Sequence, residues 1–294
     1  LLKAMMQARF GCELKVTGAT TDAEAPNLQR YYEAMAKLPP KHTLKNDSLA
    51  IFDDDATKGG SDYWSVNQGI SMRAGAARTS SGYHFGAESE VGGPIPDAYQ
   101  PANQDMVQYF DWNTLHEVGH AVDEKHKFMD GHAGKDQTTY GGWIAYGRDV
   151  RAVATKVANE FDYDLAYTQA KLSGVANPPI PAVPTDTDPE TWERQRIRVD
   201  HWVDSAQTGK NPWQSNSAAM ALELKKAAGG PEIIHDSGNG MWYGYPSAER
   251  KKGITGYQFR SPAEWFSELY AAKYSEKLKP GHPASVWLEQ LENA

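Results

Sequence analysis

The sequence contains almost no cysteine. Cys12 is the one cysteine among 294 residues, so the chain can form no internal disulfide bond and no zinc site built from several thiolates. Long apolar runs are lacking too, and none approaches the roughly 20 residues of a transmembrane helix, so we expect no membrane span. The opening LLKAMMQARFGC has neither an initiator Met nor a secretory signal pattern. We expect a processed form or a fragment of a longer protein.

Basic residues are outnumbered by acidic ones, 30 Lys and Arg against 38 Asp and Glu, and the net charge is −8 at pH 7. A general nucleic-acid binder needs a basic face to neutralise phosphates, so we expect no nucleic-acid partner. The remaining composition, with 40% hydrophobic residues and nine Trp, is typical of a globular chain. Its length suffices for one large domain or two smaller ones with a sizeable core.

The pattern of apolar residues and chain breakers predicts an α+β fold, with a small mixed sheet early and helices later. Strands are expected at 13–17 and 48–55 and within 60–100. Helices are expected at 26–38, 145–174, 190–204, 217–228 and 261–278, and loop or turn at 177–189 and 229–247.

One motif carries chemistry: TLHEVGHAVDEKH at 114–126, in a stretch predicted to be helical. Residues four apart on a helix project in almost the same direction. His116 and His120 can therefore share one Zn²⁺, each at about 2.0–2.1 Å. Glu117 lies beside that face and can take a proton from the attacking water and later give it to the leaving amine. This HExxH pattern predicts a zinc-dependent hydrolase.

The residues between the histidines support a buried helix. Leu115, Val118 and Val122 repeat with helical spacing and form an apolar stripe. Gly119 lies on the same stripe, and because glycine is a poor helix former, we expect it to mark a close approach of a second backbone.

The third ligand has two candidates. In metzincin proteases, HExxHxxGxxH supplies a third histidine after a glycine turn, which would make His126 the ligand here. The glycine position is occupied by Asp123, however, and on a continuous helix His126 would lie about 15 Å along the axis from His116. A Met-x-Tyr in GMWY at 240–243 resembles the metzincin Met-turn only faintly.

The other candidate is a carboxylate from SPAEWFSELY at 261–270, where Glu264 and Glu268 share one helical face. One could bind zinc, and the other could accept the free N–H of a ligating histidine. Ser261 to Glu264 also forms a capping box with Pro262 at the first helical position. On local sequence alone, capping and ligation by Glu264 both remain open.

These residues resemble a known family. HEVGHAVDE followed by GYQFRSPAEWFSELY is similar to the catalytic domain of anthrax lethal factor and its relatives, including the bacterial Pro-Pro endopeptidases. These are gluzincins, zinc proteases with two His and one Glu as ligands. Their pattern is HExxHAxD, then a Tyr seven residues before a Glu, with another Glu four residues later. Tyr257, Glu264 and Glu268 have this spacing.

The resemblance implies zinc ligands His116, His120 and Glu264, with Glu117 as general base. It implies that Tyr257 hydrogen-bonds the oxyanion formed from the peptide carbonyl, and that Glu268 orients a ligating histidine. It further implies a zincin-like core.

The two blocks lie about 140 residues apart, farther than the family leads us to expect. We therefore expect the first part of the catalytic domain at 1–139, a largely helical insertion at 140–240 and the rest of the domain at 241–294. The insertion's tryptophans are expected in a core: Trp143, Trp192, Trp202 and Trp213. Three other histidines are weaker candidates for the third ligand: His132, His201 and His235.

The expected function is a zinc endopeptidase acting on a protein or peptide bound in extended form along an edge strand from the 62–90 region. The resemblance suggests a bacterial toxin or effector, secreted or delivered into a target cell. Two alternatives stay open. One is a metzincin-like protease that uses His126, and the other is a non-catalytic zinc-containing recognition domain of a larger toxin.

Overall fold

A computed structural model describes most of the chain and divides it into two compact units. The first unit comprises 1–87, 97–132 and 263–294, and the second comprises 88–96 and 133–262. The residues that the structure describes are 1–17, 25–55, 62–64, 68–72, 82–83, 99, 107–133, 139–149, 152, 155–156, 163–208, 231–236 and 239–293.

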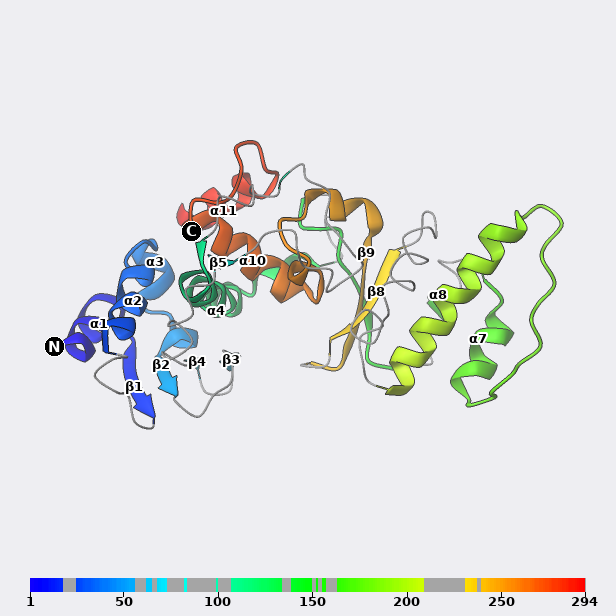
Figure 1. The fold of residues 1–294 in the computed structure, drawn as a ribbon, viewed down its shortest axis with the longest axis horizontal. Coiled ribbons are helices and arrows are strands. Elements are labelled where there is room, and N and C mark those ends of the chain that lie inside the picture. The colour runs from blue at the N-terminus through cyan, green and yellow to red at the C-terminus, as the bar shows by residue number, and fades with distance from the viewer. Residues whose placement is uncertain are drawn as a thin grey trace. The chain divides into compact units, whose positions relative to one another are not determined.

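The first unit contains a four-stranded sheet in the order β1-β2-β4-β3 (Figure 1). Its strands are β1 (Glu13–Thr17), β2 (Ile51–Asp55), β3 (Asp62–Trp64) and β4 (Gly69–Met72). β1, β2 and β4 are parallel, and β3 runs antiparallel at the edge. Leu14, Phe52 and Ile70 lie opposite one another in register and are buried together on one face of the sheet. The strands predicted at 13–17 and within 48–55 are confirmed.

Helices make up most of the other residues of this unit that the structure describes. They are α1 (Leu2–Phe10), α2 (Ala25–Met35), α3 (Pro40–Thr43), α4 (Tyr109–His126), α5 (Phe128–His132), α10 (Pro262–Tyr274) and α11 (Ala284–Asn293), with a 3-10 turn η1 (Asp47–Leu49). Two short strands, β5 (Gly82–Tyr83) and β6 (Val107–Gln108), pair in antiparallel fashion. The helices predicted at 26–38 and 261–278 are confirmed, though the second already ends at Tyr274.

Helix α4 carries the histidine motif and is the centre of this unit's core. The predicted stripe of Leu115, Val118 and Val122 is completely buried. The helix runs unbroken to His126 and ends there, since Lys127 adopts a left-handed conformation with φ of 47°. The glycine turn of a metzincin is not formed.

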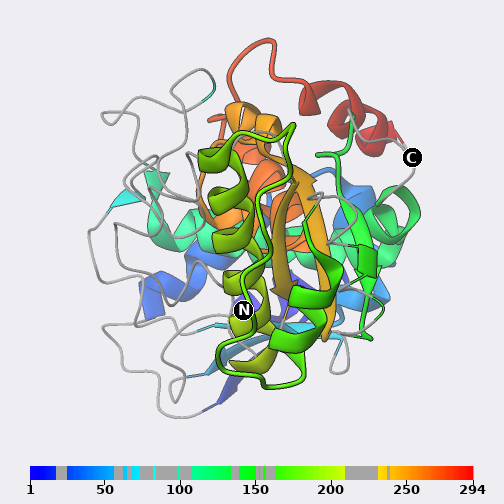
Figure 2. The same ribbon diagram turned by 90° about the vertical axis from the view of Figure 1, so that its right-hand side faces the viewer.

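The second unit has an antiparallel sheet in the order β7-β9-β8, formed by β7 (Ile144–Gly147), β8 (Pro231–Asp236) and β9 (Met241–Pro246). Helices α7 (Leu165–Leu172) and α8 (Pro189–Thr208) pack together, and α8 contacts β8 (Figure 2). Two 3-10 turns, η4 (Ser247–Lys252) and η5 (Tyr257–Phe259), follow β9.

Two predictions for the second unit are wrong. Residues 229–247 are not mostly turn, because 231–246 form the β8–β9 hairpin around Asn239 and Gly240. The helix predicted at 145–174 is replaced at its start by β7, and α7 covers 165–172. The expected insertion at 140–240 thus holds strands as well as helices.

Other predictions for this segment have mixed outcomes. The loop at 177–189 and the helix at 190–204 are confirmed, the latter as part of α8. Trp143 and Trp192 are buried, as expected of core residues. The helix expected at 217–228, Trp213 and the side chain of Trp202 lie outside the described residues.

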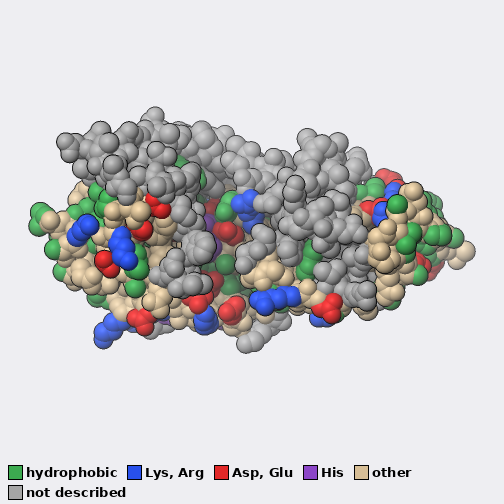
Figure 3. Space-filling view, turned by 90° about the horizontal axis from the view of Figure 1, so that it is seen from below, with side chains coloured by type: hydrophobic (Ala, Val, Ile, Leu, Met, Phe, Trp, Pro, Cys, Tyr) green, Lys and Arg blue, Asp and Glu red, His purple; other side chains and the backbone are tan. Residues whose placement is uncertain are grey.

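Acidic and basic side chains are interspersed on the face drawn in Figure 3. Among the described residues, no helix combines the length and the apolar character that crossing a membrane requires.

Candidate metal centre

Helix α4 places His116 and His120 one turn apart, with their imidazole rings close together and nearly perpendicular. The ring centroids are 4.8 Å apart with planes at 85°, and the two Nε2 atoms are separated by 3.2 Å. The helix has acidic Asp111 in its first turn and basic Lys125 and His126 in its last, which suits the helix dipole. The predicted pairing of the two histidines on one face is therefore present.

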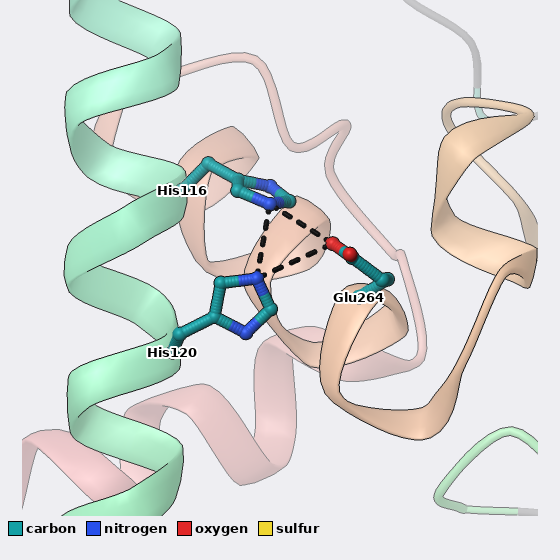
Figure 4. A group of neighbouring side chains, drawn as sticks. All are labelled: His116, His120 and Glu264. Carbon is teal, nitrogen blue, oxygen red and sulfur yellow. Dashed lines mark hydrogen bonds and ion pairs between the residues drawn. The ribbon is translucent and has the colours of Figure 1, made fainter. Parts of the chain in front are cut away.

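Glu264 approaches the two histidines from α10 (Figure 4). Its Oε2 atom lies 3.0 Å from Nε2 of His116 and 3.3 Å from Nε2 of His120. The carboxylate left open between capping and ligation thus lies against the imidazoles. These three side chains form a group that could hold a metal ion.

The geometry of the three atoms fits a tetrahedral ion. With ligand bonds of about 2.0–2.1 Å, two ligands of a tetrahedral zinc are about 3.3–3.4 Å apart. The observed separations of 3.2, 3.0 and 3.3 Å correspond closely to the three edges of one face of such a tetrahedron. A tetrahedral ion bound to these three atoms would have its fourth position left for water or substrate, as in catalytic zinc sites.

The electrostatics of the cluster suit a cation. Burial alone would lower the pKa of His116, but hydrogen bonds to the carboxylates of Glu264 and Glu268 outweigh it and raise this pKa well above its ordinary value. Burial would raise the pKa of Glu264, but the positive charge and hydrogen bonds of His120 and His116 lower it well below its usual range. The site therefore favours a positive charge between these side chains.

A second layer of contacts surrounds His116. Its Nδ1 atom lies 2.8 Å from Oε1 of Glu268, a residue with only 3% of its surface exposed. The carboxylate of Glu268 thus lies next to one of the two histidines, while its role in orienting that histidine stays a prediction. The same oxygen accepts a hydrogen bond of 3.2 Å from the indole Nε1 of Trp112. Sequence reasoning missed Trp112, although it lies four residues before His116, on the same face of the helix.

The two helices approach each other closely at Gly119. A Cβ atom at this position would lie 3.0 Å from Cα of Ser267 and 3.3 Å from its Cβ. The expected close approach of a second backbone is confirmed. Ser267 lies between Glu264 and Glu268 in the sequence, so this close approach lies beside both carboxylates.

The two residues expected to act on substrate lie in different units. Glu117 follows His116 in α4, and only 5% of its surface is exposed. Tyr257 begins η5 in the second unit, is half-buried and stacks with Arg260, whose guanidinium carbon is 4.4 Å from the ring centroid. The catalytic roles of both remain predictions.

The other histidines do not join the cluster where their side chains are described. His126 ends α4, about 15 Å along the helix axis from His116, so it cannot bind the same ion. Nδ1 of His132 lies 2.6 Å from the Phe128 carbonyl oxygen. The side chains of His201 and His235 lie outside the described residues.

Strand β3 brings an aromatic residue to the cluster. Tyr63 stacks on the ring of His120, with centroids 6.2 Å apart and planes at 14°. Since β3 is the last strand in the order β1-β2-β4-β3, a sheet edge adjoins one of the two histidines.

Comparison of the chain with protein-family models, with curated proteins and with solved structures finds no match in any of the three.

Proposed function

We propose that this protein is a zinc-dependent endopeptidase of the gluzincin type. One observation carries the proposal: Nε2 of His116, Nε2 of His120 and Oε2 of Glu264 lie 3.0–3.3 Å from one another, at the spacing of three ligands on one tetrahedral ion. A buried glutamate, Glu117, directly follows the first ligand.

A zinc ion held by these ligands would supply a Lewis acid that polarises the substrate carbonyl and lowers the pKa of water. Glu117 takes a proton from the attacking water and passes it to the leaving amine. Oε1 of Glu268 lies 2.8 Å from Nδ1 of His116, and as an acceptor for the Nδ1 proton it would present Nε2 as the ligand atom. In this proposal Tyr257 donates a hydrogen bond to the oxyanion, a role taken from the resemblance.

The proposed substrate is a protein or peptide in extended conformation. β3 lies at the edge of its sheet, and Tyr63 on this strand stacks on His120. A substrate strand that adds to β3 through main-chain hydrogen bonds would run past the metal ligands. From the resemblance alone, we propose that the enzyme acts outside the producing cell or inside a target cell.

The test combines metal analysis with a cleavage assay. Purified protein should contain one zinc per chain and cleave members of a peptide library. Glu117→Gln should retain zinc and lose activity by about 10²–10⁴-fold. Glu124→Gln, a change of the same kind farther along α4, serves as the matched control and should leave activity unchanged.

Two results would contradict the proposal. Cleavage that persists in Glu117→Gln would rule out the assigned general base. Full zinc content without turnover of any peptide would instead favour a zinc-containing recognition domain.

A further inference from the structure

We infer that Trp112 is a positioning residue for the metal centre: through Glu268 it fixes the orientation and tautomer of His116. This inference rests on the proposed function, because it assumes that His116 binds zinc through Nε2. It concerns a residue that neither binds the ion nor touches substrate.

Two nitrogen atoms on one helix lie next to one carboxylate oxygen on another helix. Oε1 of Glu268 lies 2.8 Å from Nδ1 of His116 and 3.2 Å from Nε1 of Trp112. The two nitrogen atoms belong to residues four apart on α4, so both project toward α10. All three side chains are buried, with Trp112 only 1% exposed. Water therefore cannot easily replace a lost donor.

The chemistry of these groups determines which nitrogen of the His116 imidazole carries the proton. An indole N–H can only donate a hydrogen bond, so Trp112 holds this carboxylate oxygen in place as an acceptor. An acceptor facing Nδ1 requires the proton on Nδ1, and a neutral imidazole with that proton has its lone pair on Nε2. Nε2 is the atom that lies 3.2 Å from its counterpart on His120 and 3.0 Å from Oε2 of Glu264.

Loss of the indole donor leaves a buried carboxylate with one fewer partner and more rotational freedom. Substitution of residues that hydrogen-bond zinc-binding histidines typically lowers metal affinity by about 10–100-fold. Trp112→Phe keeps most of the ring volume and removes the N–H. We expect it to weaken zinc binding by about tenfold, at the low end of that range, because Glu268 itself remains.

The experiment compares Trp112→Phe with Trp287→Phe in the full chain. Trp287 is equally buried and belongs to the same unit, where it stacks on Trp265 and Phe266. Both variants lose a buried indole, but only the first loses the donor to Glu268. Zinc affinity is measured by competition with a chromophoric chelator. The Nδ1–H signal of His116 is followed by ¹⁵N-correlated NMR of the zinc-loaded protein.

Trp112→Phe should bind zinc about tenfold more weakly and show a broadened or faster-exchanging Nδ1–H signal. Trp287→Phe should match the wild type in both readouts, even if it is less stable. In a Glu268→Ala background, Trp112→Phe should have no further effect on affinity, since both residues act through the same oxygen.

Equal zinc affinity and equal NMR signals in the two Phe variants would overturn the inference, as would full additivity with Glu268→Ala. If Trp112→Phe does not fold, site-specific replacement of Trp112 by benzothienylalanine removes the N–H and keeps the shape, with the same expected outcomes. A wild-type protein that binds no zinc would refute the proposed function itself, which is a distinguishable result.

Discussion

The substitution Gly119→Ala tests whether the distance between α4 and α10 controls the metal centre. The added Cβ would lie 3.0 Å from Cα of Ser267, whereas ordinary van der Waals contacts between carbon atoms begin at about 3.5 Å. The obstructing atom belongs to the backbone, so it cannot rotate away. The backbone of α10 must therefore give way by a few tenths of an ångström.

This displacement has different consequences for stability and for metal binding. Overpacking costs about 1–3 kcal/mol, and the better helix propensity of Ala offsets about 1 kcal/mol of it. The metal-free protein should lose only about 0–2 kcal/mol of stability. Ligand distances in a metal site tolerate only about ±0.2 Å, and Glu264 lies one turn from Ser267 on the moving helix. We expect zinc affinity to fall at least about tenfold, as for disturbed outer-layer contacts.

Urea unfolding of the metal-free protein and chelator competition measure the two quantities separately. Gly131→Ala is the matched control, because a Cβ there meets no atom within 4 Å, and it should leave zinc affinity unchanged. If Gly119→Ala binds zinc as tightly as Gly131→Ala, the close approach does not set the geometry of the site and the reasoning is refuted.

Three further predictions concern ligation, metal removal and pH. Glu264→Ala should abolish stoichiometric zinc binding. The control Glu276→Ala, which changes a glutamate in the turn after α10, should retain it. Zinc retained by Glu264→Ala would exclude Glu264 as a ligand. Removal of zinc with EDTA should lower the free energy of unfolding by about 4 kcal/mol if the free zinc concentration was about 1,000-fold above its Kd. Urea unfolding with and without EDTA measures this difference, and no change would mean that zinc does not bind the native state. Burial lowers the pKa of His42 to about 4, although the Leu291 carbonyl acts in the opposite sense. In the unfolded chain the His42 side chain is protonated below about pH 6.5, whereas in the folded chain it is protonated only below about pH 4. The free energy of unfolding therefore has its full value above pH 6.5 and falls by at most about 3 kcal/mol as the pH drops to 4. His42→Gln should flatten this dependence in urea unfolding at pH 7.5 and 4, and an equally steep loss in that variant would contradict the assignment.

Local patterns in the sequence predicted one half of the candidate site. The apolar stripe through Leu115 and Val118 specifies a buried helix, and a spacing of four puts His116 and His120 on one face of it. Such relations depend only on helix geometry. The short strands β1 and β2 were likewise predicted from local sequence.

The strands of the β8–β9 hairpin were not predicted from the local sequence. The Asn239-Gly240 pair is a hairpin turn signal, and the sequence was correctly seen as a turn there, but its flanks were not recognised as strands. β9 is the central strand of its sheet and pairs with β7, about 100 residues earlier in the chain. That partner was itself predicted to be helical.

What the sequence determined by itself was the helix with its two histidines and the short list of carboxylates that could join them. Whether Glu264 caps its own helix or faces the imidazoles was decided only by tertiary structure, as was the contact between Trp112 and Glu268, residues 156 positions apart. The physical reason is that a helix repeats within a few residues, whereas the meeting of α4 and α10 depends on how two surfaces pack, here at Gly119 against Ser267.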